Sequence, residues 1–206
     1  MAWKRMKMSP EIRQEYIELF DTCIVRPDRK GIVEEFINKL MRGTSHYDEV
    51  QAATKVPWYV VGLIHGMESY FDFGTHLHNG DSLSRRTWNE PKGRPPASVG
   101  DPPFSWVISA IDALQYDRLT AWDDWSVAGI CYKMEAYNGW GYRNHQINSP
   151  YLWSMSNHYT KGKYTVDGHF NPDVISDQVG AITALKKMTD DKLVALSAQK
   201  VVDAEA

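Results

Sequence analysis

The stretch TKVPWYVVGLIHGMESYFDFGTHLHNGDSLSRRT, residues 54–87, decides how the rest of the chain is interpreted. Its first half predicts a helix that begins after Thr54, with Pro57 in the first turn, where a missing N–H costs nothing. The apolar residues of this helix fall on more than one face, which indicates a buried helix. They are Val60, Val61, Leu63, Ile64 and Met67.

Glu68 lies in the last turn of that helix. A carboxylate at the end of a buried helix must be paired, or its surroundings must favour the neutral acid, which can donate a proton near pH 7. The ordinary alternative is an ion pair with Arg85 or Arg143. Polar residues follow in a glycine-containing segment that cannot continue the helix, and we expect them to form the far wall of a cleft: His76, His78, Asn79, Gly80, Asp81 and Thr87.

Composition restricts the class of protein. The 206 residues fit one domain. Two cysteines, Cys23 and Cys131, stand outside any C-x-x-C spacing, which argues against a disulfide framework or a zinc ribbon and favours a reduced compartment. With 23 basic and 26 acidic residues there is no basic footprint for nucleic acid. We expect no signal peptide and no membrane span.

The remaining pattern is mainly α. Residues 44–53 form a short segment, with Ser45 as its cap, that leads into the central helix. Residues 74–103 are rich in turn formers, and we expect an ordered loop or small β-hairpin there. The tail beyond Thr189 has a thin apolar stripe and is expected to fray or to need a partner. The expected helices span residues 9–25, 31–43, 55–69, 105–119, 124–138 and 172–187.

Aromatic residues with a polar edge are unusually common, with eight Trp and eleven Tyr against six Phe. Such side chains suit a cleft that stacks sugar rings, and a Trp-rich core is the alternative. Trp140 and Trp153 are open to both interpretations.

Two motifs carry a family resemblance. HGMESYFDF, residues 65–73, is similar to the helix-end Glu-Ser motif of the lysozyme-like superfamily, and MEAYNGWGYR, residues 134–143, resembles the A-Y-N-x-G segment of its lytic transglycosylases. FGTHLHNGDSL, PPFSWVISAIDAL and SPYLWSMSNHYTKGKY look like a narrower group of phage and bacterial lysozyme-family proteins. The resemblance runs from about Pro57 to Gly180. It implies a lysozyme-like helical domain over residues 1–188, with supporting helices in 1–53, a catalytic core in 54–188 and a tail in 189–206.

The resemblance also implies roles. Glu68 would be the catalytic acid. Asp81 and Thr87 resemble the Asp and Thr of phage lysozymes, although the spacing from Glu68 is longer here. The transglycosylases' G-x-x-Q-x-M-P segment is missing, which argues against a purely lytic mechanism. An Asp81 that orients water, with Thr87 fixing that water, predicts inversion at the anomeric carbon.

Several of these residues have ordinary alternatives. Asp81 follows Asn79-Gly80, and a role in an Asx-turn is the alternative to its catalytic role. Tyr137, Asn138 and Tyr142 would hold an N-acetyl sugar, although Asn138-Gly139 is also a common helix stop. His76 would hydrogen-bond substrate or Asp81, and Glu135 is either a second carboxylate or structural. We expect no cofactor and no metal.

The predicted function is an N-acetylmuramidase that hydrolyses the glycan strands of peptidoglycan. It would act as a phage endolysin that stays in the host cytoplasm until a holin-like partner releases it, or as a lysin associated with virion proteins. A first rival is a metal-dependent peptidoglycan amidase or peptidase built on His65, His76 and His78, whose spacing matches no standard metal motif. A second is a non-catalytic wall-binding protein on the same scaffold.

Overall fold

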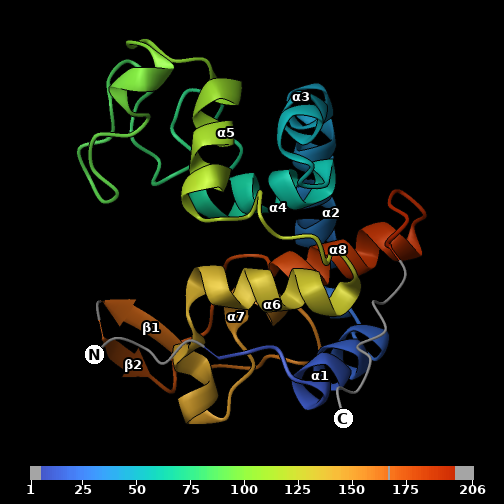
Figure 1. Ribbon diagram of the computed structural model, residues 1–206. Coiled ribbons are helices and arrows are strands. Elements are labelled where there is room, and N and C mark those ends of the chain that lie inside the picture. Colours follow the sequence, from blue (N-terminus) through green and yellow to red (C-terminus); the bar gives the residue numbers. More distant parts are fainter. Residues whose placement is uncertain (1–5, 167, 198–206) are drawn as a thin grey trace, which may run out of the picture. The chain divides into compact units, whose positions relative to one another are not determined.

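The computed structural model describes residues 6–166 and 168–197, and these form a mainly helical structure, as the sequence predicts (Figure 1). Along the chain the elements are α1 (Pro10–Asp21), η1 (Pro27–Arg29), α2 (Lys30–Arg42), α3 (Thr44–Thr54), α4 (Trp58–Ser69), η2 (Ala97–Val99), α5 (Trp106–Tyr116), α6 (Val127–Asn138), η3 (Trp140–His145), α7 (Pro150–Trp153), β1 (Lys163–Val166), β2 (His169–Asn171) and α8 (Ala181–Asp190). None of the helices in the described residues has the length and apolar character needed to cross a membrane.

The chain divides into two compact units. Unit 1 combines residues 1–36 with residues 124–206, and unit 2 is residues 37–123. The division falls inside α2, so that helix contributes to both. The single domain over residues 1–188 stays a prediction, because a compact unit need not fold alone.

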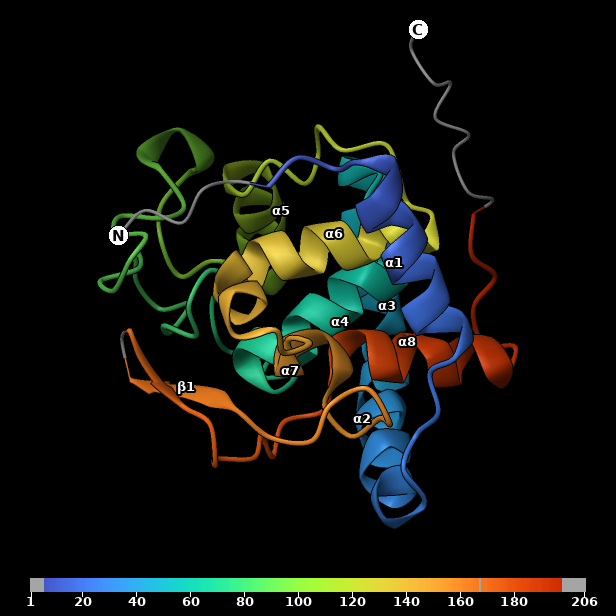
Figure 2. The same ribbon diagram turned by 90° about the horizontal axis from the view of Figure 1, so that it is seen from below.

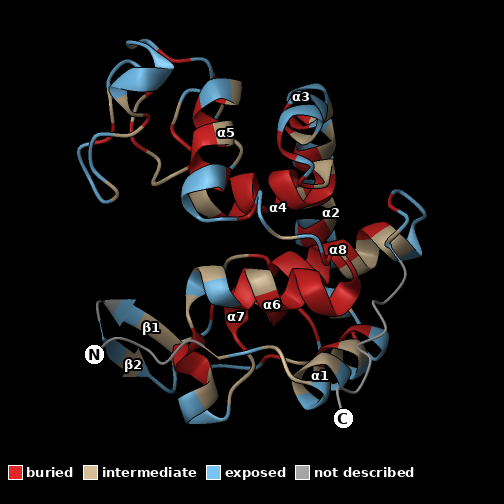
Figure 3. Cartoon of the chain, in the orientation of Figure 1, coloured by how far each residue is buried: buried red, intermediate tan, exposed pale blue. Residues whose placement is uncertain are grey.

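Unit 2 is built on α4, which is buried along almost its whole length (Figure 3). All five apolar residues named for it in the sequence are buried, as predicted. The start of the helix differs from the prediction. Lys55, with a left-handed φ of 65°, ends α3, and Pro57 rather than Thr54 is the N-cap of α4. The segment before it is a full helix, α3, whose N-cap is Gly43 rather than Ser45.

The buried face of α5 is polar in part, which periodicity did not predict. Ser105 caps this helix by accepting a hydrogen bond from the amide of Ile108 at 3.3 Å. The spacing of apolar residues in 105–119 predicts that Ile108 points inward with Val107, Ile111 and Leu114, yet Ile108 is 40 % exposed, while Ser109 and Asp112 are buried. Both polar residues bind histidines of the 74–104 loop, and these contacts decide which face of α5 is covered.

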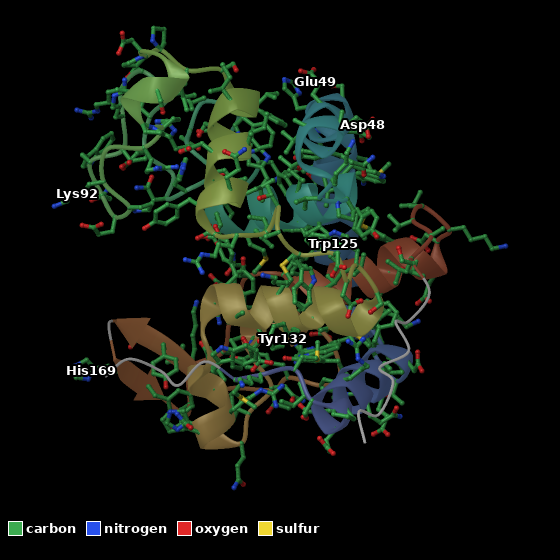
Figure 4. All side chains as sticks on the ribbon, viewed as in Figure 1. Asp48, Glu49, Lys92, Trp125, Tyr132 and His169 are labelled. Atoms are coloured by element: carbon green, nitrogen blue, oxygen red, sulfur yellow. The ribbon has the colours of Figure 1, made fainter. Side chains whose placement is uncertain are left out.

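Unit 1 packs α1 against α6, and α7 against both α6 and α8 (Figure 2). Ser9 and Ser126 cap α1 and α6 by accepting amide hydrogen bonds three residues ahead, so these starts are set locally. Tyr132 of α6 donates its hydroxyl to the Met6 carbonyl at 2.6 Å, which ties the N-terminal segment to α6 (Figure 4).

The hairpin of the described residues lies late in the chain, not after α4. β1 and β2 pair antiparallel, with Lys163 opposite Asn171 and Tyr164 opposite Phe170. The segment after α4 has only one isolated bridge, between Thr75 and Ser82, so it takes the loop form of the two expected.

The last helix is shorter than predicted. It begins at Ala181 rather than near residue 172. Before it, the Asp173 amide donates to the Asn171 side chain and the Gly162 amide donates to the Val174 carbonyl, at 2.9 Å and 2.8 Å. These bonds hold residues 171–174 beside the hairpin and prevent an earlier helix start. Of the predicted tail, residues 198–206 lie outside the described part.

Candidate functional site

Unit 1 contains a groove that is large enough to hold a ligand. It encloses about 440 Å³, a volume within the range of about 300 to 1,000 Å³ typical of ligand sites. Two residues that the sequence assigned to sugar binding, Asn138 and Tyr142, lie in its wall. Among the described residues, those that line the groove are Asn138, Gly139, Gly141, Tyr142, Pro150, Tyr151, Lys163, Tyr164, Thr165, Gly168, Ser176 and Gln178.

The end of α6 forms one side of this groove. Asn138 is the last residue of the helix and its side-chain amide donates to the Ser149 hydroxyl at 3.1 Å. Gly139 follows with a φ of 90°, a conformation that other residues adopt only with strain. The chain then turns directly into η3. The helix stop and the sugar-contact interpretation of Asn138-Gly139 are therefore compatible.

The hairpin forms the other side and is held by aromatic packing. Tyr142 and Tyr164 rings meet edge to face at 5.1 Å, and His145 stacks on Phe170 at 3.7 Å between ring centroids. The Tyr164 amide donates to the Tyr142 hydroxyl at 3.2 Å, and burial raises the pKa of that phenol. A Cβ on Gly141 would lie 2.9 Å from the Tyr164 hydroxyl, so glycine permits this approach of η3 to β1.

Glu135 lies in a neighbouring polar pocket of about 240 Å³ and is tightly paired. Arg143 donates to both of its carboxylate oxygens, at 2.8 Å and 2.9 Å, and Tyr16 donates its hydroxyl at 2.5 Å. Burial by itself lowers the pKa of Arg143, but the hydrogen bonds and charge of Glu135 outweigh it and raise the pKa. Of the two roles left open for Glu135, these contacts favour the structural one.

Glu68 is placed as the sequence indicated, in the last turn of α4 in unit 2. Ten of the twelve residues of α4 are buried, whereas Glu68 is half-buried and therefore reaches solvent. Tyr70 ends the helix with a left-handed φ of 53°. Glu68 is therefore a partly exposed acidic residue at the end of an otherwise buried, apolar helix.

Asp81 organises the loop after α4. It is 4 % exposed, and its carboxylate accepts hydrogen bonds from the amides of Trp88 and Asn89 and from the side chains of Asn79 and Asn89, at 2.8 to 3.0 Å. Burial by itself raises the pKa of Asp81, but these four donors outweigh it and lower the pKa. Its acceptor sites are occupied by the protein's own groups, and the Asn79 side chain also accepts from the Asp81 amide, as in an Asx-turn.

Thr87 also directs its polar side-chain atom to groups of the same loop. Its hydroxyl donates to the Pro91 carbonyl and accepts from the Arg94 amide, and the residue is 4 % exposed. The structure therefore brings Asp81 and Thr87 into one loop, but gives each a full set of internal partners.

The histidines proposed for a metal site have separate partners. His65 contacts the Tyr47 hydroxyl at 2.9 Å, and the Nε2–H of His76 donates to the Arg85 carbonyl while its Nδ1 accepts from Ser109. His78 Nε2 donates to Asp112 at 2.9 Å. Among the described residues no group of three or more His, Cys, Asp or Glu side chains is arranged to hold a metal ion. His76 is fully buried, which also removes it from contact with a substrate.

The remaining aromatic candidates divide between core and groove. Trp140 and Trp153 are buried and neither is among the described residues that line the groove, so packing is the role that the structure favours for both. Tyr137 is half-buried and is not part of the groove lining. Tyr151 and Tyr164 line the groove without having been singled out from the sequence.

The hairpin is the part of the site that the sequence analysis missed. Lys163, Tyr164 and Thr165 line the groove from β1. A signal was present in KYTVDGHFN, where alternating apolar and polar residues flank Asp167-Gly168, a dipeptide typical of tight hairpins.

A scan against protein-family models finds no match, and neither the curated proteins nor the solved structures contain a significant one.

Proposed function

We propose that the protein is a peptidoglycan-degrading glycoside hydrolase of the N-acetylmuramidase type. The observation that carries the glycan-binding part of this proposal is the groove of unit 1, whose wall combines tyrosine rings, side-chain amides and hydroxyls. Pyranose rings stack on aromatic faces, and their N-acetyl and hydroxyl groups need donors and acceptors at the rim. Asn138 and Tyr142 would hold the N-acetyl sugar.

Glu68 is the proposed general acid. Cleavage of a glycosidic bond requires a carboxylic acid that protonates the leaving oxygen as the oxocarbenium-like state develops. Glu68 combines a half-buried position with a place in the last turn of an apolar helix. The oxygen of a water molecule would then bond to the anomeric carbon in place of the leaving oxygen, and the proton that this water loses restores the acid form of Glu68.

Asp81 and Thr87 were the proposed water-positioning pair of an inverting reaction. Their hydrogen bonds within the loop favour a different contribution, in which they fix the shape of the segment that follows Glu68. The proposal therefore assigns the chemical step to Glu68 and the loop shape to Asp81 and Thr87. The stereochemistry of the product distinguishes the two assignments, since a positioned water gives inversion.

The motifs that resemble phage and bacterial lysozymes support a biological setting. The protein would act as an endolysin that a holin-like, membrane-permeabilising partner releases, or as a lysin associated with virion proteins. Its substrate would then be the glycan strands of the bacterial wall.

The test is digestion of purified peptidoglycan followed by mass spectrometry of the fragments. We expect new reducing ends at N-acetylmuramic acid. Glu68→Gln keeps the shape of the side chain and removes its proton, so the rate should fall by at least about a hundredfold, the lower range for loss of general acid catalysis. Glu49→Gln is a matched control, because Glu49 is an exposed residue of α3 in the same unit (Figure 4).

Each alternative predicts a distinct result. New amino groups without new reducing ends would indicate an amidase or peptidase. A Glu68→Gln variant that keeps its full effect on the wall would remove the catalytic assignment and favour a binding protein. Anhydro ends would indicate a lytic rather than hydrolytic reaction.

A further inference from the structure

Trp88 differs from other large apolar side chains of the 74–104 loop. Leu77, Leu83 and Phe104 are buried, whereas Trp88 is 44 % exposed. Among the described residues none accepts a hydrogen bond from its indole N–H. A single exposed apolar residue is ordinary on a protein surface, so the surroundings of Trp88 decide what its ring can do.

The backbone that carries this indole is fixed by hydrogen bonds. The amides of Trp88 and Asn89 both donate to the buried carboxylate of Asp81, at 2.9 Å and 3.0 Å. The guanidinium carbon of Arg85 lies 3.7 Å from the centre of the Trp88 ring, a cation–π contact that restricts rotation of the side chain. The ring is thus held in place before a ligand binds, which lowers the entropy cost of binding.

The same hydrogen bonds bring Trp88 to the end of α4. Asp81, which binds the Trp88 amide, directly follows Gly80. A Cβ on Gly80 would lie 4.0 Å from the Glu68 carbonyl oxygen, so this turn packs against the last turn of the helix. All four residues belong to unit 2. Trp88 is therefore carried by a segment that is tied, through one turn of the loop, to the backbone of Glu68.

We propose that Trp88 is a stacking platform for a sugar ring of the glycan strand that Glu68 cleaves. This inference rests on the proposed function, because it assumes that Glu68 acts on a glycan. The indole offers a broad apolar face to a pyranose ring and an N–H donor to a hydroxyl or an N-acetyl oxygen. Because a glycan strand is extended and repetitive, one sugar reaches Trp88 while another lies at Glu68. Residues of unit 2 alone form this contact.

The first experiment measures steady-state kinetics of the full chain on soluble, peptide-bearing glycan fragments of peptidoglycan. Trp88→Ala should raise KM by about tenfold and change kcat by less than about twofold, because a platform binds the ground state and the transition state alike. Trp88→Phe keeps a ring but loses the N–H, so we expect a rise in KM of about threefold.

Tyr116→Ala is the matched control. Tyr116 is a 52 % exposed aromatic residue of unit 2, and it too lies beneath a guanidinium group, that of Arg94, at 5.1 Å from the ring centre. Its backbone belongs to α5 and not to the segment tied to Glu68. We therefore expect the KM of this variant to equal that of the wild type.

The second experiment observes the indole directly and does not depend on the stability of Trp88→Ala, which thermal unfolding checks. The Glu68→Gln chain, which should bind without cleavage, is labelled with ¹⁵N-tryptophan and titrated with the same fragments. The signal of the Trp88 indole N–H, assigned by its loss in Trp88→Phe, should shift as the fragments bind. The signal of Trp106, a buried residue of the same unit, should stay in place.

The failures of the inference and of the proposed function are distinguishable. If the wild type cleaves peptidoglycan and Trp88→Ala leaves KM unchanged, Trp88 binds no sugar and the proposed function stands. A fall in kcat at constant KM also overturns the inference, because Trp88 would then shape the loop beside Glu68 rather than bind substrate. A Trp88 signal that stays in place at saturation has the same consequence. If the wild type cleaves no glycan, the proposed function fails and the inference fails with it.

Discussion

The loop of residues 74–104 and the groove of unit 1 are both rich in polar side chains, but they use them differently. In the loop, Asp81, Thr87 and His76 direct their polar atoms to amides, carbonyls and hydroxyls of the protein itself. In the groove, Asn138 and Lys163 border open space. A long segment without regular structure must supply hydrogen-bond partners for its own backbone N–H and C=O groups, and its polar side chains serve as those partners.

This contrast explains why some features of the structure could be predicted from the sequence and others could not. Helix starts were predicted well at Ser9 and Ser105, because a cap depends on atoms three residues apart. The exposure of Ile108 was predicted wrongly, because the buried face of α5 is set by contacts to histidines about thirty residues earlier in the chain. Periodicity records local pattern and carries no information about such partners.

The largest effect is expected from Asp81→Ala. The change leaves the amides of Trp88 and Asn89 without the acceptor of their part-buried hydrogen bonds, and an amide left unsatisfied in this way costs about 1 to 3 kcal/mol. We expect the free energy of unfolding to fall by about 3 kcal/mol, as measured by urea denaturation. Asp101→Asn is the matched control, since Asp101 is an exposed carboxylate of the same loop and should change stability by less than about 0.5 kcal/mol. If both variants changed the free energy of unfolding equally, the contrast between the loop and the groove would fail, because Asp81 would then not stabilise the loop.

The second largest effect is expected from acid, which should destabilise unit 2. Burial lowers the pKa of His65 from 6.5 to about 4. Burial also lowers the pKa of His78 from 6.5 to about 4, despite the opposing charge of Asp112. Between these pH values the unfolded chain binds more protons than the folded one, so the free energy of unfolding decreases as the pH falls from about 6.5 to about 4. We expect a loss of about 2 kcal/mol over this window, visible in thermal melts and in faster amide exchange of the loop.

The variants for this pH dependence come from both regions. His78→Asn should flatten the slope, because it removes one of the two groups that must stay neutral. His169→Asn should leave the slope unchanged, since His169 is exposed on the hairpin (Figure 4). If the free energy of unfolding stays constant from pH 6.5 to pH 4, these histidines take up water or protons without disturbing the loop.

From the sequence, only those parts of the site that coincide with a local signal could be predicted. Asn138-Gly139 marks a helix end in the sequence, and the same residues border the groove because a helix that stops leaves its last turn uncovered. Glu68 was placed correctly at the end of α4 for the same reason. The assignment of His76 to substrate failed, because its burial arises from Ser109 and the Arg85 carbonyl, which no spacing in the sequence reveals.

The smallest effect should come from Asn138→Ala, and it tests the groove side of the comparison. Asn138 is exposed and makes one side-chain hydrogen bond, to Ser149, so its removal should cost less than about 0.5 kcal/mol of stability. Its amide is nevertheless available to an N-acetyl group, and the loss of one such hydrogen bond should weaken glycan binding by about fivefold, or about 1 kcal/mol. Calorimetry with chitotetraose, a glycan that carries N-acetyl groups, measures this directly. A variant that loses stability but no affinity would place Asn138 with Asp81, as a residue whose polar atoms serve the fold and not the ligand.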